Sequence, residues 1–153
     1  MSDRTVTHAT FALERVYPVP PARVFNAFAD AKAKEKWFAG PSEGWTQTAK
    51  SMDFRVGGIE ISNGKVRNGP TIEFHATYWD IVPDERIIYS YWMRMDGKPI
   101  SVSLATIEMK AEGKGTRLKL VEQGAFLDGF DDPALRERGT RDLLDALGRA
   151  LET

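Results

Sequence analysis

The side chains of this sequence that are best placed to do chemistry are one glutamate and a pair of tyrosines. Glu122 follows Leu118 and Leu120 at every second position, so the three side chains share one face of a predicted strand. A carboxylate on an apolar face can orient a ligand, act as an acid or base with a raised pKa, or pair with Arg136 or Arg138. A strand end in water, or a structural ion pair, is the simpler interpretation.

Tyr89, Tyr91 and Met93 form a second set, because alternation places them together on one strand face. A buried tyrosine hydroxyl needs a hydrogen-bond partner, and in a cavity a ligand can be that partner. Core packing is the alternative for each residue taken alone, but we expect several such residues to line a pocket. Glu122 and Tyr91 are also the two catalytic candidates. The predicted pocket lining is Trp37, Phe54, Phe74, Tyr89, Tyr91, Met93, Leu120, Glu122, Phe126, Gly139 and Leu143.

Metal and nucleophile chemistry has little support in the sequence. The chain has no cysteine, which excludes disulfides, thiolate catalysis and cysteine metal sites. His75 is the only histidine of the predicted folded region, because His8 lies in a start that we expect to be frayed. A zinc site needs several ligands, and no GxSxG, HExxH, Walker or GxGxxG motif is present. We therefore expect neither a metal nor a cofactor.

Length and charge limit the class of protein. The 153 residues suit one domain, with a folded core at about residues 10–151. Lysine and arginine number 21 against 22 aspartate and glutamate residues, a balance that argues against nucleic acid as a partner. No apolar run approaches the roughly 20 residues of a membrane span, and the N-terminus lacks the hydrophobic segment of a signal peptide. We expect a cytoplasmic protein.

The elements that must position these side chains alternate between strands and turns through the middle of the chain. Pairs such as Asn63-Gly64, Asn68-Gly69 and Asp96-Gly97 favour tight hairpins. Two short helices, Pro21–Ala29 and Ala31–Phe38, follow the first strand. The predicted strands are Thr10–Tyr17, Ala49–Val56, Ile59–Ser62, Thr71–Ile81, Arg86–Met95, Ile100–Lys110 and Thr116–Gln123.

A long helix ends the chain. Asp132 can cap it and Pro133 suits its first position. Its predicted apolar stripe is Leu135, Gly139, Leu143, Ala146, Leu147 and Ala150. Such a helix must lie across one face of the sheet, because neither apolar surface can be left in water. A glycine inside a helix costs about 0.5–1 kcal/mol relative to alanine, so Gly139 indicates either close packing on the sheet or room for a ligand.

Five motifs in this order resemble a known superfamily. They are PPARVFNAF at Pro20–Phe28, Trp37, DFRVGG at Asp53–Gly58, DIVPDERIIYSY at Asp80–Tyr91, and GTRLKLVEQGAF at Gly115–Phe126. Over residues 10–151 the chain resembles the START-like, or SRPBCC, proteins. Within them it is most similar to the family of the C-terminal domain of the activator of heat-shock protein 90 ATPase.

The resemblance implies an α+β helix-grip fold, in which about seven curved antiparallel strands wrap a long C-terminal helix around an apolar cavity. Many family members have Gly-Trp where this chain has Gly139-Thr140, so we expect different helix packing or a roomier cavity. The implied function is binding of a hydrophobic or amphipathic small molecule. A cyclase- or hydratase-like enzyme and a chaperone-interacting module are the alternatives, and self-association is a further expectation.

Overall fold

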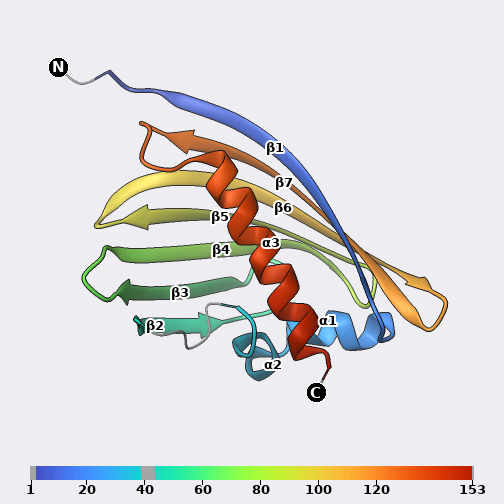
Figure 1. Ribbon diagram of the computed structural model, residues 1–153. Coiled ribbons are helices and arrows are strands. Elements are labelled where there is room, and N and C mark those ends of the chain that lie inside the picture. The colour runs from blue at the N-terminus through green and yellow to red at the C-terminus, as the bar shows by residue number, and fades with distance from the viewer. Residues whose placement is uncertain (1–2, 39–43, 153) are drawn as a thin grey trace.

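A seven-stranded antiparallel sheet curves around a long C-terminal helix in the computed structural model, which describes residues 3–38 and 44–152 (Figure 1). The spatial strand order is β1-β7-β6-β5-β4-β3-β2, so the first strand pairs with the last and β1 and β2 form the edges. The strands are β1 (Val6–Tyr17), β2 (Trp45–Met52), β3 (Ile59–Val66), β4 (Thr71–Val82), β5 (Arg86–Met95), β6 (Lys98–Glu112) and β7 (Gly115–Leu127). The predicted helix-grip fold is confirmed.

Three helices in the described residues complete the fold. The short helices α1 (Pro21–Ala29) and α2 (Ala31–Glu35) lie between β1 and β2, and α3 (Pro133–Ala150) crosses the concave face of the sheet (Figure 1). The predicted cap of α3 is present, since Asp132 accepts a hydrogen bond from the backbone N–H of Ala134 at 2.9 Å. The second helix is shorter than predicted and ends before Trp37.

One predicted hairpin turn is wrong. Asn63-Gly64 lies inside β3, which continues to Val66, whereas the Asn68 and Asp96-Gly97 turns do adopt positive φ. Gly64 is needed for a different reason. A Cβ atom on it would lie 2.1 Å from the ring of Trp45, so the missing side chain makes room for an aromatic ring of the neighbouring strand.

The strands at both edges also differ from their predicted bounds. β1 begins at Val6 and pairs with β7 over its whole length, so His8 lies opposite Ala125 and is not frayed. At the other edge β2 runs over residues 45–52, and Asp53–Gly58 forms a tight turn in place of the predicted strand end. Long-range pairing sets these bounds, and local pattern alone does not reveal it.

The helix α3 contacts the core mainly through its C-terminal half. Leu144 and Leu147 are fully buried there, and the hydroxyl of Tyr17 donates a hydrogen bond to the backbone oxygen of Leu144 at 2.7 Å. In the N-terminal half, Leu135 is 56% exposed. The predicted stripe is therefore displaced by about one position, and Thr140 is buried in place of Gly139. The first turns of α3 stand over a pocket and not over packed core.

Candidate ligand-binding pocket

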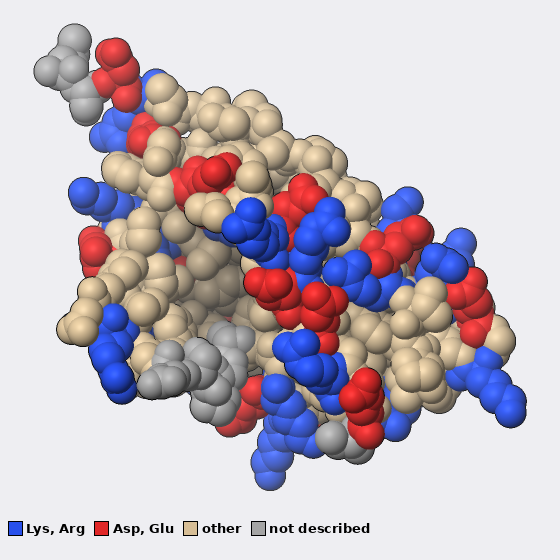
Figure 2. All heavy atoms as spheres, in the orientation of Figure 1, with Lys and Arg blue, Asp and Glu red and all other residues tan. Residues whose placement is uncertain are grey.

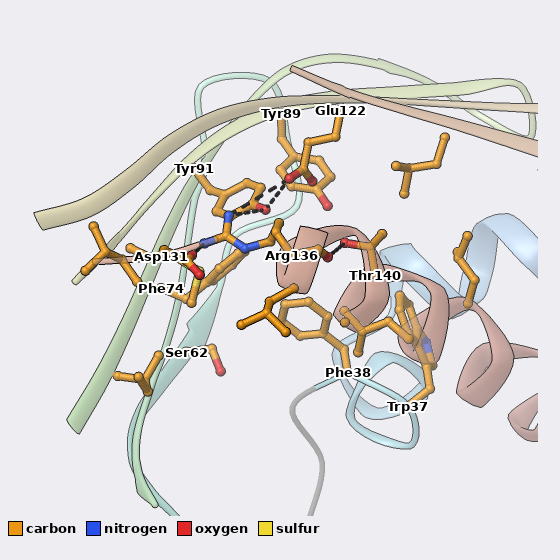
Figure 3. Close-up of a pocket in the computed structure, with 18 of the residues that line it drawn as sticks. Trp37, Phe38, Ser62, Phe74, Tyr89, Tyr91, Glu122, Asp131, Arg136 and Thr140 are labelled. Carbon is orange, nitrogen blue, oxygen red and sulfur yellow. Dashed lines mark hydrogen bonds and ion pairs between the residues drawn. The ribbon is translucent and has the colours of Figure 1, made fainter. Parts of the chain in front are cut away.

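A pocket of about 440 Å³ lies between the concave face of the sheet and the N-terminal half of α3, and its mouth is a hollow beside the charged residues of that helix (Figure 2). This volume is within the usual range for small-molecule sites, about 300–1,000 Å³. Its walls come from α1, α2, the five strands β3 to β7, the β7–α3 loop and α3 (Figure 3). The residues around it are Phe28, Lys34, Trp37, Phe38, Ser62, Ile72, Phe74, Tyr89, Tyr91, Met93, Met95, Ile100, Leu120, Glu122, Phe130, Asp131, Leu135, Arg136, Gly139, Thr140, Leu143 and Leu144.

Strand alternation builds the aromatic wall. Tyr89, Tyr91 and Met93 project from one face of β5, and Phe74 of β4 lies opposite Met93 in the ladder. The ring of Tyr91 lies between two others, with centroids 5.0 Å from Phe74 and 6.0 Å from Tyr89. Phe38 then meets Phe74 edge-on at 5.2 Å. The result is a continuous aromatic surface from α2 to the centre of the sheet.

Every residue of the predicted lining faces this pocket except Phe54 and Phe126, which the structure places elsewhere. Phe54 belongs to the turn after β2 and packs on Tyr78 and Phe25, with centroids 4.9 and 5.7 Å away. Phe126 is buried near the end of β7, and the guanidinium of Arg136 lies 5.3 Å from its ring centroid. Strand alternation alone does not predict where these two side chains lie, because their positions depend on how the ends of β2 and β7 are placed in the fold.

Gly139 lies at the pocket, and a Cβ atom built on it meets nothing within 4 Å. Close packing on the sheet is therefore not the reason for this glycine, and of the two interpretations the open space is the one that fits. Thr140 beside it is buried, and its hydroxyl donates a hydrogen bond to the backbone oxygen of Arg136 at 2.9 Å. Thr140 also borders the pocket, so a small side chain lies there.

Arg136, Asp131, Lys34 and Phe38 are pocket residues that the predicted lining omitted. The sequence indicates Arg136 only as a partner of Glu122. Lys34 gave no signal, because it belongs to the polar segment AKAKE and nothing marks it as buried. Phe38 and Asp131 lie just outside regular elements, where periodicity predicts no orientation.

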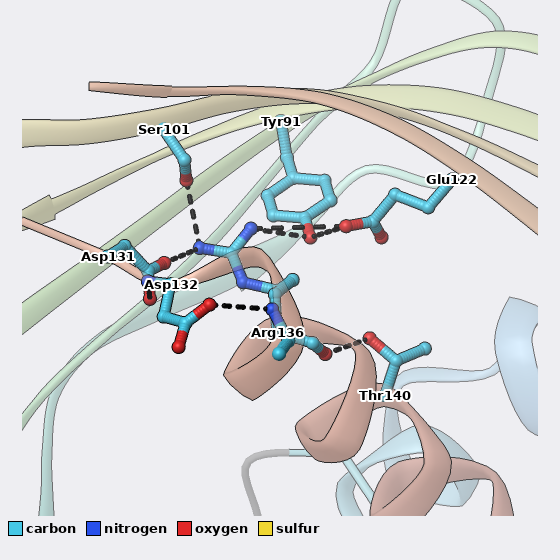
Figure 4. A network of polar contacts seen from close by, with 8 residues as sticks. Tyr91, Ser101, Glu122, Asp131, Asp132, Arg136 and Thr140 are labelled. Atoms are coloured by element: carbon cyan, nitrogen blue, oxygen red, sulfur yellow. Dashed lines mark hydrogen bonds and ion pairs between the residues drawn. The ribbon is translucent and has the colours of Figure 1, made fainter. Parts of the chain in front are cut away.

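A polar cluster joins α3 to the sheet at one side of the pocket (Figure 4). The hydroxyl of Tyr91 donates a hydrogen bond to Glu122 Oε2 at 2.8 Å, and Arg136 Nη1 donates one to the same hydroxyl at 3.0 Å. Arg136 Nη1 itself lies 3.9 Å from Glu122 Oε2. The side chain of Glu122 is 4% exposed and that of Arg136 is 11% exposed, so the cluster is almost fully buried.

The second guanidinium nitrogen of Arg136 is also engaged. It donates a hydrogen bond to Ser101 Oγ at 2.9 Å and forms an ion pair with Asp131 of the β7–α3 loop. Arg136 thus ties helix, sheet and loop together. We refer to Tyr91, Ser101, Glu122, Asp131 and Arg136 as the Arg136 cluster.

Burial changes the pKa of Glu122. Removal from water raises the pKa of this carboxyl, while the hydrogen bond from Tyr91 and the charge of Arg136 lower it, and the first effect is the larger. Burial likewise raises the pKa of Tyr91, so its hydroxyl stays protonated and remains a donor. Both contacts to Glu122 end on Oε2, and within the described residues no hydrogen bond reaches Oε1.

A second buried group, the Lys34 cluster, consists of Lys34, Glu60 and Tyr78. Lys34 Nζ lies 2.6 Å from Glu60 Oε1, and the hydroxyl of Tyr78 donates to the same oxygen. Lys34 and Glu60 are 8% and 5% exposed. Burial lowers the pKa of Lys34, and Glu60 opposes that shift. The ammonium group also lies 4.4 Å from the ring centroid of Phe38.

The fold and the pocket allow comparison with known proteins. The family model of the Activator of Hsp90 ATPase homolog 1-like protein matches residues 18–152. The chain belongs to this family. The match covers both short helices, every strand except β1, and α3. No protein of curated function matches the chain.

Solved structures with the same fold come from several bacteria. The chain is 46% identical to the Mll3558 protein from Rhizobium loti, with 95% of this chain and 99% of that chain covered and a TM-score of 0.89. A protein from Rhizobium leguminosarum is 41% identical, with 99% of both chains covered and a TM-score of 0.93. Protein CV1439 from Chromobacterium violaceum is 30% identical over 94% of this chain and 97% of that chain, with a TM-score of 0.78.

Two negative findings apply to residues 3–38 and 44–152. No helix there combines the length and hydrophobicity that a membrane crossing requires. In the same part of the chain, no three histidine, cysteine, aspartate or glutamate side chains are grouped so that they could hold a metal ion.

Proposed function

We propose that this member of the family binds a hydrophobic or amphipathic small molecule in the pocket beneath α3. The observation that carries the proposal is the pocket itself, about 440 Å³ with mostly aromatic and aliphatic walls. Such a surface gains free energy when a ligand replaces water, at about 25 cal/mol for each Å² of apolar area buried. A few polar groups among apolar walls are typical of sites that orient a ligand.

The available polar atoms support an orienting role. Glu122 Oε1 has no hydrogen bond within the described residues, and no partner is present there for the hydroxyl of Tyr89 either. The two residues come from β7 and β5, the strands on either side of β6, and border the same pocket. A ligand with one polar end could therefore satisfy both atoms while its apolar part lies along the aromatic wall.

Titration with the neutral dye N-phenyl-naphthylamine, whose emission rises in apolar surroundings, tests the proposal. We expect saturable binding, and at least about tenfold weaker binding for Met93→Trp, which fills the pocket. Val102→Trp is the matched control, because Val102 is 51% exposed on the outer face of the sheet. Absence of saturable binding, or equal binding by both variants, would reject the proposal.

Acid–base catalysis of the cyclase or hydratase type is a second candidate, and the Arg136 cluster supports it. A buried carboxyl with a raised pKa beside a tyrosine hydroxyl is suited to proton transfer. If a substrate is found, Glu122→Gln should lower kcat by about 100-fold or more. An unchanged kcat would remove Glu122 from the mechanism.

A chaperone-interacting role has the family name as its support. It requires a cytoplasmic location, which cell fractionation tests, and a contact with the chaperone itself. Purified chaperone should then bind this chain at micromolar concentration and change its ATPase rate. Failure of both measurements would reject this candidate and leave small-molecule binding unaffected.

A further inference from the structure

We infer that the ligand of this pocket carries an amine, and that its ammonium group binds between the Glu122 carboxylate and the aromatic wall. The inference rests on the proposed function and names the chemical class of the ligand. Three observations support it: the charges at the pocket, the geometry of Glu122, and the position of Lys34 and Arg136 over aromatic rings.

Charge at the pocket is unbalanced. Lys34 is paired with Glu60 at 2.6 Å, and Arg136 is in contact with Asp131. Each cation thus has a carboxylate of its own. Glu122 is the third carboxylate, and the nearest cation, Arg136, lies 3.9 Å away and already holds Asp131. Among the described residues at the pocket, two cations against three carboxylates leave one negative charge in excess.

The position of Glu122 makes that excess charge available to a ligand. One carboxylate oxygen takes both contacts from Tyr91 and Arg136, and the other has none within the described residues. The side chain is 4% exposed and borders the pocket. A carboxylate oxygen of a nearly buried side chain is costly to leave without a hydrogen bond, and an ammonium group that donates to Oε1 would remove that cost.

The aromatic wall favours the same ligand group. A cation gains energy over the face of an aromatic ring within about 6 Å. Both buried cations of the pocket are placed in this way, with Arg136 5.5 Å from the ring centroid of Tyr91 and Lys34 4.4 Å from that of Phe38. The faces of Phe74 and Tyr89 continue the same wall. An ammonium group near Glu122 would therefore have rings beside it.

Within the described residues, an anionic ligand finds no comparable partner. Arg136 Nη1 is used by Tyr91, and Nη2 is used by Ser101 and Asp131. A ligand carboxylate would have to displace Asp131 and would then lie close to Glu122. Like charges in a buried site cost free energy, which disfavours acids relative to alcohols and amines of the same shape.

Calorimetric titration with three matched probes tests the inference: naphthylethylamine, naphthylethanol and naphthylpropanoate. We expect the amine to bind about tenfold more tightly than the alcohol near neutral pH, and the acid to bind most weakly. If the alcohol binds and the amine binds no better, the inference is overturned while the proposed function stands. If none of the three binds, both fail.

Two variants distinguish the effect of the Glu122 charge on binding from the effect of the pocket's shape. Glu122→Gln should abolish the preference for the amine over the alcohol, because it removes charge and keeps size. Asp131→Asn should reduce the preference to about threefold, because the released Arg136 can pair with Glu122. An amine preference that survives Glu122→Gln would overturn the inference.

The pH dependence is a further readout. The titratable and charged groups around Glu122 are Tyr89 and Tyr91 on β5, Arg136 on α3 and Asp131 in the loop. Because burial raises the pKa of Glu122, amine affinity should increase as pH rises through that pKa and the carboxylate forms. The amine itself stays charged, since alkylammonium groups such as lysine have a pKa of about 10.4. Alcohol affinity should stay flat, and a flat amine curve would contradict the inference.

Discussion

The Arg136 cluster and the Lys34 cluster both border the same pocket, and they differ in how completely their charges are matched. In the Lys34 cluster one ammonium group, one carboxylate and one hydroxyl meet at a single oxygen of Glu60. In the Arg136 cluster one guanidinium serves two carboxylates, and Glu122 keeps one oxygen without a hydrogen bond within the described residues.

The difference indicates that the Lys34 cluster stabilises the fold, whereas the Arg136 cluster is available to a ligand. A buried pair with matched charges is fully used in holding α2 to β3, and it offers a ligand little. In the Arg136 cluster, by contrast, Glu122 Oε1 can still accept a hydrogen bond from a ligand, because no group of the described fold occupies it. We therefore expect substitutions in the Lys34 cluster to act mainly on stability, and substitutions in the Arg136 cluster to act mainly on ligand binding and on pH dependence.

Glu60→Ala should have the largest effect of the variants considered. It leaves the ammonium group of Lys34 buried without its carboxylate and the hydroxyl of Tyr78 without its acceptor. Breaking a buried ion pair in this way costs about 3–5 kcal/mol. The free energy of unfolding, measured by urea denaturation, should fall by that amount.

A double variant guards against simple failure to fold. Lys34→Met combined with Glu60→Gln removes both charges and keeps an acceptor for Tyr78. We expect this protein to unfold within about 2 kcal/mol of the original, because removing both members of a buried pair is often nearly neutral. A double variant as unstable as Glu60→Ala would show that packing, and not the unmatched charge, causes the loss.

Gly139→Leu should weaken dye binding by about tenfold, or about 1.4 kcal/mol, and leave stability unchanged or slightly higher. The new side chain enters open space at the pocket, and leucine favours a helix more than glycine does. Gly148→Ala is the matched control, since its Cβ atom would lie 3.2 Å from the ring of Tyr17, outside the pocket. Unchanged dye binding in Gly139→Leu would show that this part of the pocket holds no ligand.

Much of the fold was accessible from the sequence, for physical reasons. Local signals predicted several elements correctly. The aspartate and proline at the start of α3 mark its cap at Asp132, and the Asp96-Gly97 pair marks a turn with positive φ. Alternation also placed Tyr89, Tyr91 and Glu122 on the concave face. The bounds of β1 and β2 escaped because they depend on pairing with strands distant in sequence.

The site was less accessible, because charge matching is a long-range property. Lys34 and Glu60 lie 26 residues apart, and neither stands on a clearly apolar stripe. Arg136 and Asp131 take their roles only when the loop after β7 folds back on α3. Phe54 was misplaced for a similar reason, since the end of β2 decides which way it faces.

Glu122→Gln should change the pH dependence of stability. Because burial raises the folded pKa of Glu122 above its usual value of 4.5, the folded state holds this proton more tightly than the unfolded state does. Its contribution is fully present below that value and is lost as pH rises through the folded pKa. The loss is about 1.4 kcal/mol for each unit of difference.

Urea denaturation between about pH 5 and pH 8 measures this. The variant, which cannot titrate, should gain stability relative to the original protein as pH rises. In the Lys34 cluster, by contrast, the pKa of Lys34 is lowered from 10.5, and its titration adds stability as pH rises toward that value. A constant difference between Glu122→Gln and the original protein across the range would contradict a raised pKa.

Tyr91→Phe should have the smallest effect, and its pH dependence identifies the cause. Loss of one hydrogen bond costs about 1 kcal/mol, and the loss removes a contact that lowers the pKa of Glu122. The folded pKa of Glu122 therefore rises further, so the destabilisation should grow with pH up to that value.

Tyr17→Phe is the matched control, because it deletes the same atom from a hydrogen bond to the backbone oxygen of Leu144, which does not titrate. If both variants lose the same free energy at every pH, Tyr91 is not coupled to the protonation of Glu122, and the contrast between the two clusters reduces to their ion pairs alone.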